Sequence, residues 1–106
     1  MADTLELQKV KGKLFNLRWL PKEAAQIKVS LSENLVLYKN SSQIIGDERI
    51  VTVDSFGVWE VDLMETDSMS DDAHYIFEIA GRTYHKYVPI NAQDWEFNDL
   101  PSALNG

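Results

Sequence analysis

The sequence predicts an all-β protein, a single antiparallel β-sandwich of about seven to eight strands, with a small barrel as the alternative architecture. Short runs of β-branched and aromatic residues recur along the chain, with turn signals roughly every 8 to 12 residues between them. Helical apolar periodicity is almost absent. The length of 106 residues suits one core, so we expect one domain over residues 1–106, with frayed ends near 1–4 and 102–106.

A first strand is expected from about Leu5 to Phe15, where roughly alternating residues surround Gly12. A glycine inside a strand indicates a bulge or a close approach of another group to the backbone. Pro21 ends any strand before it. The next segment, QIKVSL (residues 26–31), alternates apolar and polar side chains cleanly, which predicts a half-buried antiparallel strand.

The segment NLVLY (34–38) follows a short polar turn and can form a hairpin with the preceding strand around Ser32 to Asn34. Residues 40–48 then form a loop by composition. Ile44 and Ile45 interrupt this loop, and we expect them to fill the core rather than to form a long element.

The strongest local signal is RIVTVDSFGVWEVDL, residues 49–63, which predicts a hairpin. Two β-branched and aromatic runs flank Asp54-Ser55-Phe56-Gly57, where Gly57 can adopt the left-handed conformation of a four-residue or bulged loop. In the second run, period two directs one set of side chains to the core and the other to solvent. The core set is Trp59, Val61 and Leu63, and the opposite set is Val58, Glu60 and Asp62.

Residues 64–73 are expected to form an acidic surface loop, and residues 75–89 a hairpin with Gly81-Arg82 as its two-residue turn. Pro89 ends its second strand, because proline lacks the N–H that a ladder needs. The first arm presents Tyr75, Phe77 and Ile79 on one face; the second presents either Tyr84, Lys86 and Val88 or Thr83, His85 and Tyr87. The tail is expected to add a short strand or one helical turn near Asp94 to Leu100 and to fray after Pro101.

Composition excludes several classes of function. The absence of cysteine rules out disulfides, thiolate nucleophiles and cysteine-based metal sites. No signal peptide begins the chain and no apolar run is long enough to span a bilayer, so we expect a soluble protein made in the cytoplasm. Residues 1–53 carry eight basic against six acidic side chains, and residues 54–106 carry two against eleven. This balance disfavours nucleic acid and anionic membrane surfaces as partners.

Two groups of carboxylates are candidates for chemistry. Glu60 and Asp62 share one strand face at a spacing near that of a glycosidase acid/base pair, but a solvated strand face has the same pattern and is favoured. Asp67, Asp71 and Asp72 are weak calcium candidates. The ligand order of an EF-hand is absent, so a solvated loop is again favoured.

His74 and His85 lie on the two arms of the second hairpin and can approach each other across it. With Glu78 or Asp72 they can form a metal site, but their spacing is not that of zinc proteins, and surface histidines are favoured. A Gly-rich phosphate loop and a GxSxG elbow are both absent. We therefore expect no enzyme and no cofactor.

Aromatic rings at period two on adjacent strands are typical of a sandwich core, and Trp59, Tyr75 and Phe77 are assigned to it. Other aromatic and basic residues are candidates for contact with a partner or a sugar. These binding candidates are Arg18, Trp19, Arg82, His85 and Tyr87.

Four motifs in order, VKGKL, VDSFGVWEVDL, YIFEIAGRTYHKYVP and WEFNDLP, resemble a small β-sandwich domain of tail proteins from siphophages of Gram-positive bacteria. The resemblance covers about residues 8–101 and consists mostly of turn and core positions, which specify a fold better than an activity. The matching positions are Gly12, Gly57, Trp59, Val61, Asp62, Leu63, Tyr75, Phe77, Gly81, Tyr84, Val88, Pro89, Asp99 and Leu100.

The resemblance implies a baseplate or tail-tip component, similar to the shoulder-like domain of lactococcal phage receptor-binding proteins. The implied function is non-enzymatic: tail or baseplate assembly, or host adsorption, through contacts with other tail proteins or a host surface component. The chain ends at Gly106 without a host-binding head, which favours an accessory or adaptor role. The alternative is a carbohydrate-binding module that uses exposed aromatics against cell-wall glycans. A homo-oligomer and a place in the virion tail after synthesis in the host cytoplasm both stay open.

Overall fold

The computed structural model describes residues 7–15, 25–38, 42–46, 48–70 and 72–103. The regular secondary structure of this part of the chain consists of strands and two short 3-10 helices, joined by turns and loops. The strands are β1 (Leu7–Lys13), β2 (Gln26–Leu31), β3 (Leu35–Leu37), β4 (Gln43–Ile45), β5 (Arg49–Thr52), β6 (Val58–Met64), β7 (Tyr75–Ile79), β8 (Arg82–Lys86) and β9 (Trp95–Glu96). The 3-10 helices are η2 (Thr66–Ser68) and η3 (Phe97–Asp99).

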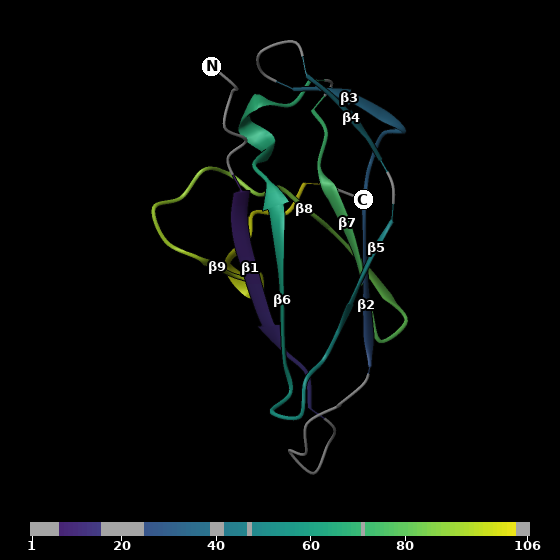
Figure 1. Cartoon of the computed structure of the whole chain (residues 1–106), viewed down its shortest axis with the longest axis vertical. Helices are drawn as coiled ribbons and strands as arrows, with labels where there is room; N and C mark the ends of the chain where they lie inside the picture. The colour runs from purple at the N-terminus through teal and green to yellow at the C-terminus, as the bar shows by residue number, and fades with distance from the viewer. Residues whose placement is uncertain (1–6, 16–24, 39–41, 47, 71, 104–106) are drawn as a thin grey trace.

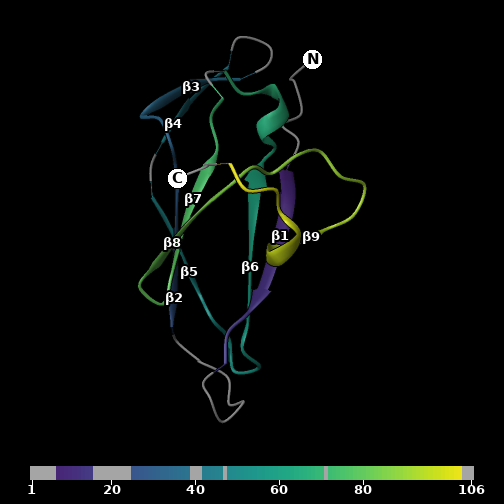
Figure 2. The same cartoon turned by 180° about the vertical axis from the view of Figure 1, so that it is seen from behind.

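Two sheets face each other and a two-stranded hairpin lies at one end of them (Figures 1 and 2). One sheet has the order β6-β1-β9 and the other β5-β2-β7-β8, while β3 pairs with β4. All pairings are antiparallel except that of β1 with β9. The prediction of an all-β sandwich is confirmed.

The core lies between the two sheets and follows the period-two patterns of the sequence. Trp59 from β6 and Phe77 from β7 meet in its centre, with ring centroids 6.2 Å apart, and Phe97 of η3 packs against both. The inward side chains of the facing sheets are almost fully buried. They include Val10, Ile27, Val29, Trp59, Val61, Leu63, Tyr75, Phe77 and Ile79.

Gly12 has the close backbone approach that a glycine within a strand predicts. It pairs with Trp59 across β1 and β6, and a Cβ atom at this position would collide with the indole ring. The absence of a side chain therefore lets the large ring of Trp59 lie against the β1 backbone.

The predicted hairpin around Ser32 to Asn34 is wrong. Strand β2 is flanked on its two edges by β5 and β7, so no edge remains for β3. The backbone N–H of Ser32 instead donates to the carbonyl of His74, and β3 turns away to pair with β4. Ile44 and Ile45 belong to this β4 strand and do not fill the core: Ile45 is 68% exposed.

The predicted hairpin over residues 49–63 is correct in its turn and wrong in its strand pairing. Gly57 has φ +81°, and its N–H donates to the carbonyl of Asp54 at 3.0 Å, as expected for the tight turn. The two strands then separate, because β5 pairs with β2 and all seven residues of β6 pair with β1. The turn is therefore a corner through which the chain passes from one sheet to the other.

The hairpin of β7 and β8 is confirmed, with its turn one residue earlier than predicted. Ile79 pairs with Arg82, so the two loop residues are Ala80 and Gly81, both with positive φ (51° and 80°). These values are typical of the type I′ turn, whose twist suits a hairpin. Tyr84 lies opposite Phe77, which selects the face of Tyr84, Lys86 and Val88 from the two alternatives.

The sequence predicted a short strand or one helical turn in the tail, and the structure has both, as β9 and η3. It continues in contact beyond Pro101: Ser102 bridges to Lys86, and the N–H of Ala103 donates to the carbonyl of His85 at 2.9 Å. Ser102 and Ala103 thus lie against β8. Residues 1–4 and 104–106 lie outside the described residues.

Candidate functional site

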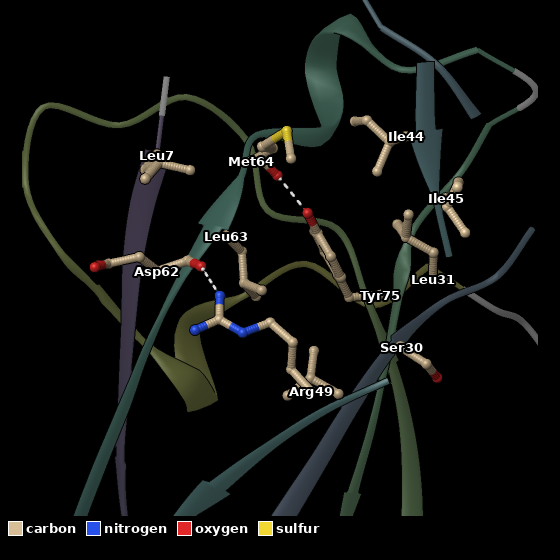
Figure 3. A pocket seen from close by; sticks show the side chains of 11 residues that line it. Leu7, Ser30, Leu31, Ile44, Ile45, Arg49, Asp62, Leu63, Met64 and Tyr75 are labelled. Carbon is tan, nitrogen blue, oxygen red and sulfur yellow. Dashed lines mark hydrogen bonds between the residues drawn. The ribbon is translucent and has the colours of Figure 1, made fainter. Parts of the chain in front are cut away.

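An apolar hollow of about 380 Å³ opens between the outer strand β6 of one sheet and strands β2 and β5 of the other, beside the β3–β4 hairpin (Figure 3). Its volume is within the range of small-molecule and side-chain binding pockets. Most of its lining is aliphatic or aromatic, including Leu7, Leu31, Ile44, Leu63, Met64 and Tyr75. We call this feature the apolar hollow.

Two side chains from the four-stranded sheet cross the hollow and hold the backbone of β6. Arg49 Nη1 donates to the carbonyl of Asp62 at 2.7 Å, and the Tyr75 hydroxyl donates to the carbonyl of Met64 at 2.9 Å (Figure 3). Burial raises the pKa of the Tyr75 hydroxyl above its usual range, so it stays a neutral donor. These bonds satisfy carbonyl groups on the outermost strand and tie the two sheets together.

Arg49 gives the hollow a positive charge. A guanidinium has five N–H donors, and one of them makes the bond to Asp62. The carboxylate of Asp62 points away from Arg49, which meets only the backbone carbonyl (Figure 3). The hollow therefore combines an apolar wall with a cation that can receive an anionic group.

The outer face of the β3–β4 hairpin is apolar and exposed. Leu35, Leu37 and Ile45 are 52%, 53% and 68% exposed. Leu35 lies opposite Ile45 across the hairpin, so these side chains share one face, while Val36 on the opposite face is fully buried. We call the exposed set the apolar hairpin face.

The hairpin is anchored to the body of the protein on two sides. The N–H of Leu37 donates to Ser70 Oγ at 3.1 Å, and the N–H of Ser70 donates to the carbonyl of Leu37 at 3.0 Å. Tyr38 donates its hydroxyl to Glu65 Oε2. These contacts hold the apolar hairpin face in a fixed position.

Glu65 corrects the prediction that residues 64–73 form an acidic surface loop. It is fully buried, and its second carboxylate oxygen accepts from the N–H of Ser68 at 3.0 Å. A buried carboxylate is stable only when donors surround it, and Glu65 caps η2 as well as receiving the Tyr38 hydroxyl.

The turn between β5 and β6 lies at the other end of the sheets from the β3–β4 hairpin (Figure 1) and carries Phe56. Phe56 is 77% exposed. Asp54 Oδ1 accepts from the N–H groups of Phe56 and Val58 at 2.8 and 3.0 Å, and its own N–H donates to the carbonyl of Val58 at 2.9 Å. The turn is thus rigid although its most apolar side chain faces solvent.

The structure brings only some of the predicted binding residues together. Arg18 and Trp19 lie outside the described residues. Arg82 is at the turn end of β8, paired with Ile79, whereas His85 lies three positions further along on the opposite face. A strand advances about 3.3 Å per residue, so Arg82 is separated from His85 by roughly 10 Å.

His85 and Tyr87 instead gather around His74. His74 Nε2 lies 2.9 Å from His85 Nδ1, which confirms that the two histidines approach each other across the hairpin. The ring of Tyr87 packs edge-on against His74, and its hydroxyl donates to both carboxylate oxygens of Asp72 at 2.7 Å. This bond to Asp72 raises the pKa of Tyr87.

Tyr87, Asp67 and Asp72 also line a second hollow of about 580 Å³, which we call the mixed hollow because Met69, Pro89 and Pro101 line it as well. Asp67 Oδ2 accepts from the N–H of Ile90 at 2.9 Å, and Asp72 is held by Tyr87. Asp71, the third calcium candidate, lies outside the described residues. Within the described part of the chain, no three His, Asp or Glu side chains converge as a metal site would require.

Glu60 and Asp62 lie on the outward face of β6, as predicted, and both are exposed. Glu60 pairs with Lys9 of β1 at 3.6 Å. The pair therefore has the surroundings of a solvated strand face, which the sequence favoured over an acid/base pair.

Sequence reasoning missed the roles of Arg49, Phe56 and Leu35. One available signal was Phe56 itself, because a large apolar residue in the middle of a polar turn departs from the usual composition of turns. The sequence offered no comparable signal for Leu35, Leu37 and Ile45, because they fall on one face only once β3 and β4 are paired.

Comparison with models of known protein families finds no match, and comparison with curated proteins finds none either. The fold and the surface define the chain as an all-β sandwich with an apolar hollow and an apolar hairpin face. Among the described residues, no helix has the length and apolar character needed to cross a lipid bilayer.

Proposed function

We propose that this protein is a non-enzymatic, phage tail-associated β-sandwich that acts in tail or baseplate assembly, or in host adsorption, by binding another tail protein. The single observation that carries the binding role is the apolar hairpin face of Leu35, Leu37 and Ile45. Its assignment to a phage tail is supported by the resemblance of the turn and core motifs.

The apolar hairpin face favours a protein partner for energetic reasons. Contiguous exposed aliphatic side chains are typical of interaction sites, whereas single ones are ordinary. Each of these half-exposed side chains contributes on the order of 1 kcal/mol when a partner covers it, so the face supplies about 3 kcal/mol before other contacts. The anchors to Ser70 and Glu65 reduce the entropy lost on binding, since the hairpin is already fixed.

The direct test is whether the chain is part of the particle and whether this face keeps it there. Purified virions of the encoding phage are labelled with an antibody to the chain, and tails are assembled with a Leu35→Ser, Leu37→Ser double variant. We expect wild type on the tail and a reduced amount of the variant. Ile90→Ser is the matched control, because Ile90 is also about half exposed (50%) but lies outside the hairpin.

Two results contradict the proposal. Labelling that is absent from both virions and assembling tails removes the tail-associated function. Labelling that is equally strong with the double variant removes the apolar hairpin face as the contact and leaves the location intact.

A second candidate, binding of cell-wall glycans, is favoured by the mixed hollow. Tyr87, Asp67 and Asp72 line it together, and an aromatic ring beside carboxylates is the composition that sugars contact. Tyr87→Ala is expected to abolish retention of the protein on purified cell walls if this function holds. Retention that is absent in wild type rules it out.

A further inference from the structure

The exposed ring of Phe56 and the apolar hollow have complementary chemistry. Phe56 projects from a turn that is fixed by Asp54 and by the left-handed Gly57. An exposed aromatic on a rigid support loses little entropy when it is buried, which is the property of an anchor residue at a protein interface. Within the described residues, the ring has the largest exposed fraction of the large hydrophobic side chains.

The apolar hollow has the matching features of a receptor for such a ring. About 380 Å³ of space is lined by Leu31, Ile44, Tyr75 and neighbouring apolar side chains. Arg49 is beside this space, and its guanidinium has donors beyond the one that binds the carbonyl of Asp62. A partner segment with an aromatic ring and a carboxylate a few residues apart would fill the apolar space with the ring and pair the carboxylate with Arg49.

We propose that two copies of this chain associate head to tail, with Phe56 of one copy entering the apolar hollow of the next. The carboxylate of Asp54 lies two residues from Phe56 and accepts two backbone N–H groups through Oδ1. A carboxylate has further acceptor sites, so Asp54 can also receive Arg49 of the neighbouring copy. A second copy is favoured as the occupant because one chain carries both the acidic–aromatic turn and its basic–apolar counterpart.

The positions of the two features support this arrangement. The β5–β6 turn and the β3–β4 hairpin lie at opposite ends of the sheets (Figure 1), and the lining of the hollow includes Ile44 and Ile45 of that hairpin (Figure 3). A single chain therefore cannot fill its own hollow with its own Phe56. Each copy offers one turn and one hollow, which is a heterologous contact that builds rings or open chains. This inference goes beyond the proposed function, because it depends on Phe56 and Arg49; the hollow shares only Ile45 with the apolar hairpin face, and neither Leu35 nor Leu37 lines it.

The test uses sedimentation velocity on the full chain at rising concentration, up to about 1 mM, with three variants. Phe56→Ser removes the ring, and Arg49→Glu reverses the charge of the hollow. Leu7→Glu places a charge in the lining at a side chain that is 55% exposed, so that loss of folding in one hollow variant does not end the test. Ile90→Ser again serves as the matched control.

We expect wild type and Ile90→Ser to exceed the monomer mass and each of the three variants to weaken association at least tenfold. The decisive sample mixes Phe56→Ser with Leu7→Glu. Each is monomeric alone, but together they retain one intact turn and one intact hollow, so a one-to-one complex should form.

Three results overturn the proposal: wild type that stays monomeric at about 1 mM, association that survives Phe56→Ser, or a mixture that forms no complex. None of these results bears on the binding of the protein to the tail, which is measured independently through Leu35 and Leu37. Failure of this inference is thus distinguishable from failure of the proposed function.

Discussion

Replacing Gly12 with alanine is expected to destabilise the protein, although alanine suits a strand better than glycine. The new Cβ would overlap the indole ring of Trp59, which is 2% exposed and packs against Phe77 and Phe97. Overpacking of this kind costs about 1–3 kcal/mol. The better strand propensity of alanine offsets roughly 0.5–1 kcal/mol of it. The middle values of these two ranges leave an expected net loss of unfolding free energy of about 1 kcal/mol.

Urea denaturation followed by tryptophan fluorescence measures this loss, as a lower transition midpoint with an unchanged slope. The companion variant is Trp59→Phe, whose smaller ring leaves room for the methyl group. In that background Gly12→Ala should cost at least about 0.5 kcal/mol less, because residues in contact couple in a double-mutant cycle. Equal costs in both backgrounds, or no cost in either, would refute the argument that the indole is the reason for the glycine.

Three further predictions concern buried and capped polar groups. Tyr38→Phe removes the hydroxyl that donates to buried Glu65 and is expected to lower stability by about 1–3 kcal/mol; an unchanged Tm would contradict this. Tyr75→Phe should flatten the alkaline stability profile. Burial raises the folded-state pKa of Tyr75 above that of the unfolded chain, so its contribution is complete below about pH 10 and is lost as pH rises through the folded pKa, by up to about 1.4 kcal/mol per pH unit. A wild-type profile that is equally flat would disprove it. Asp54→Ala should speed amide hydrogen exchange at Phe56, since the carboxylate caps that N–H; unchanged protection would show that the turn is fixed by its backbone alone.

The sequence predicted the strands and their inward faces because period two is a local property. Trp59 and Phe77 are buried where alternation places them, and Gly57 has the predicted positive φ. The β7–β8 hairpin was also predictable, since its two strands are joined by two residues and pair with each other. These features depend on neighbours along the chain, which a single sequence contains.

The pairing of the other strands was not predictable, because it depends on competition between distant segments. Strand β2 pairs with β5 and β7, and this choice leaves β3 without its sequence neighbour. The burial of Glu65 depends likewise on Tyr38, a residue 27 positions away. An acidic run by itself predicts a solvated loop. The burial of one of its carboxylates can be recognised only when the distant hydrogen-bond donor is known.

The same limit applies to the candidate binding surfaces. Arg49 and Tyr75 both reach carbonyls of β6 across the sandwich only because β5 and β6 belong to different sheets, whereas the local signal of residues 49–63 predicts that these two strands pair. Aromatic and basic composition selected Arg82 and Tyr87, which the fold then separated from one another. Composition identifies residues that can bind, whereas topology decides which of them share a surface.

The corner at Asp54 to Gly57 connects the fold to both of its unusual apolar features. A true hairpin would pair β5 with β6 and close the side of the sandwich where the apolar hollow now opens. Because the strands separate, Arg49 and Tyr75 must bridge the gap by donating to carbonyls of β6, and the space between them becomes the hollow. The tight turn needed at the corner also points Phe56 into solvent. The separation of β5 from β6 therefore produces both a projecting ring and a cavity of the size to hold one. A variant with a longer turn that lets β5 and β6 pair would close this side of the sandwich. Such a variant should lose the projecting ring and the hollow together.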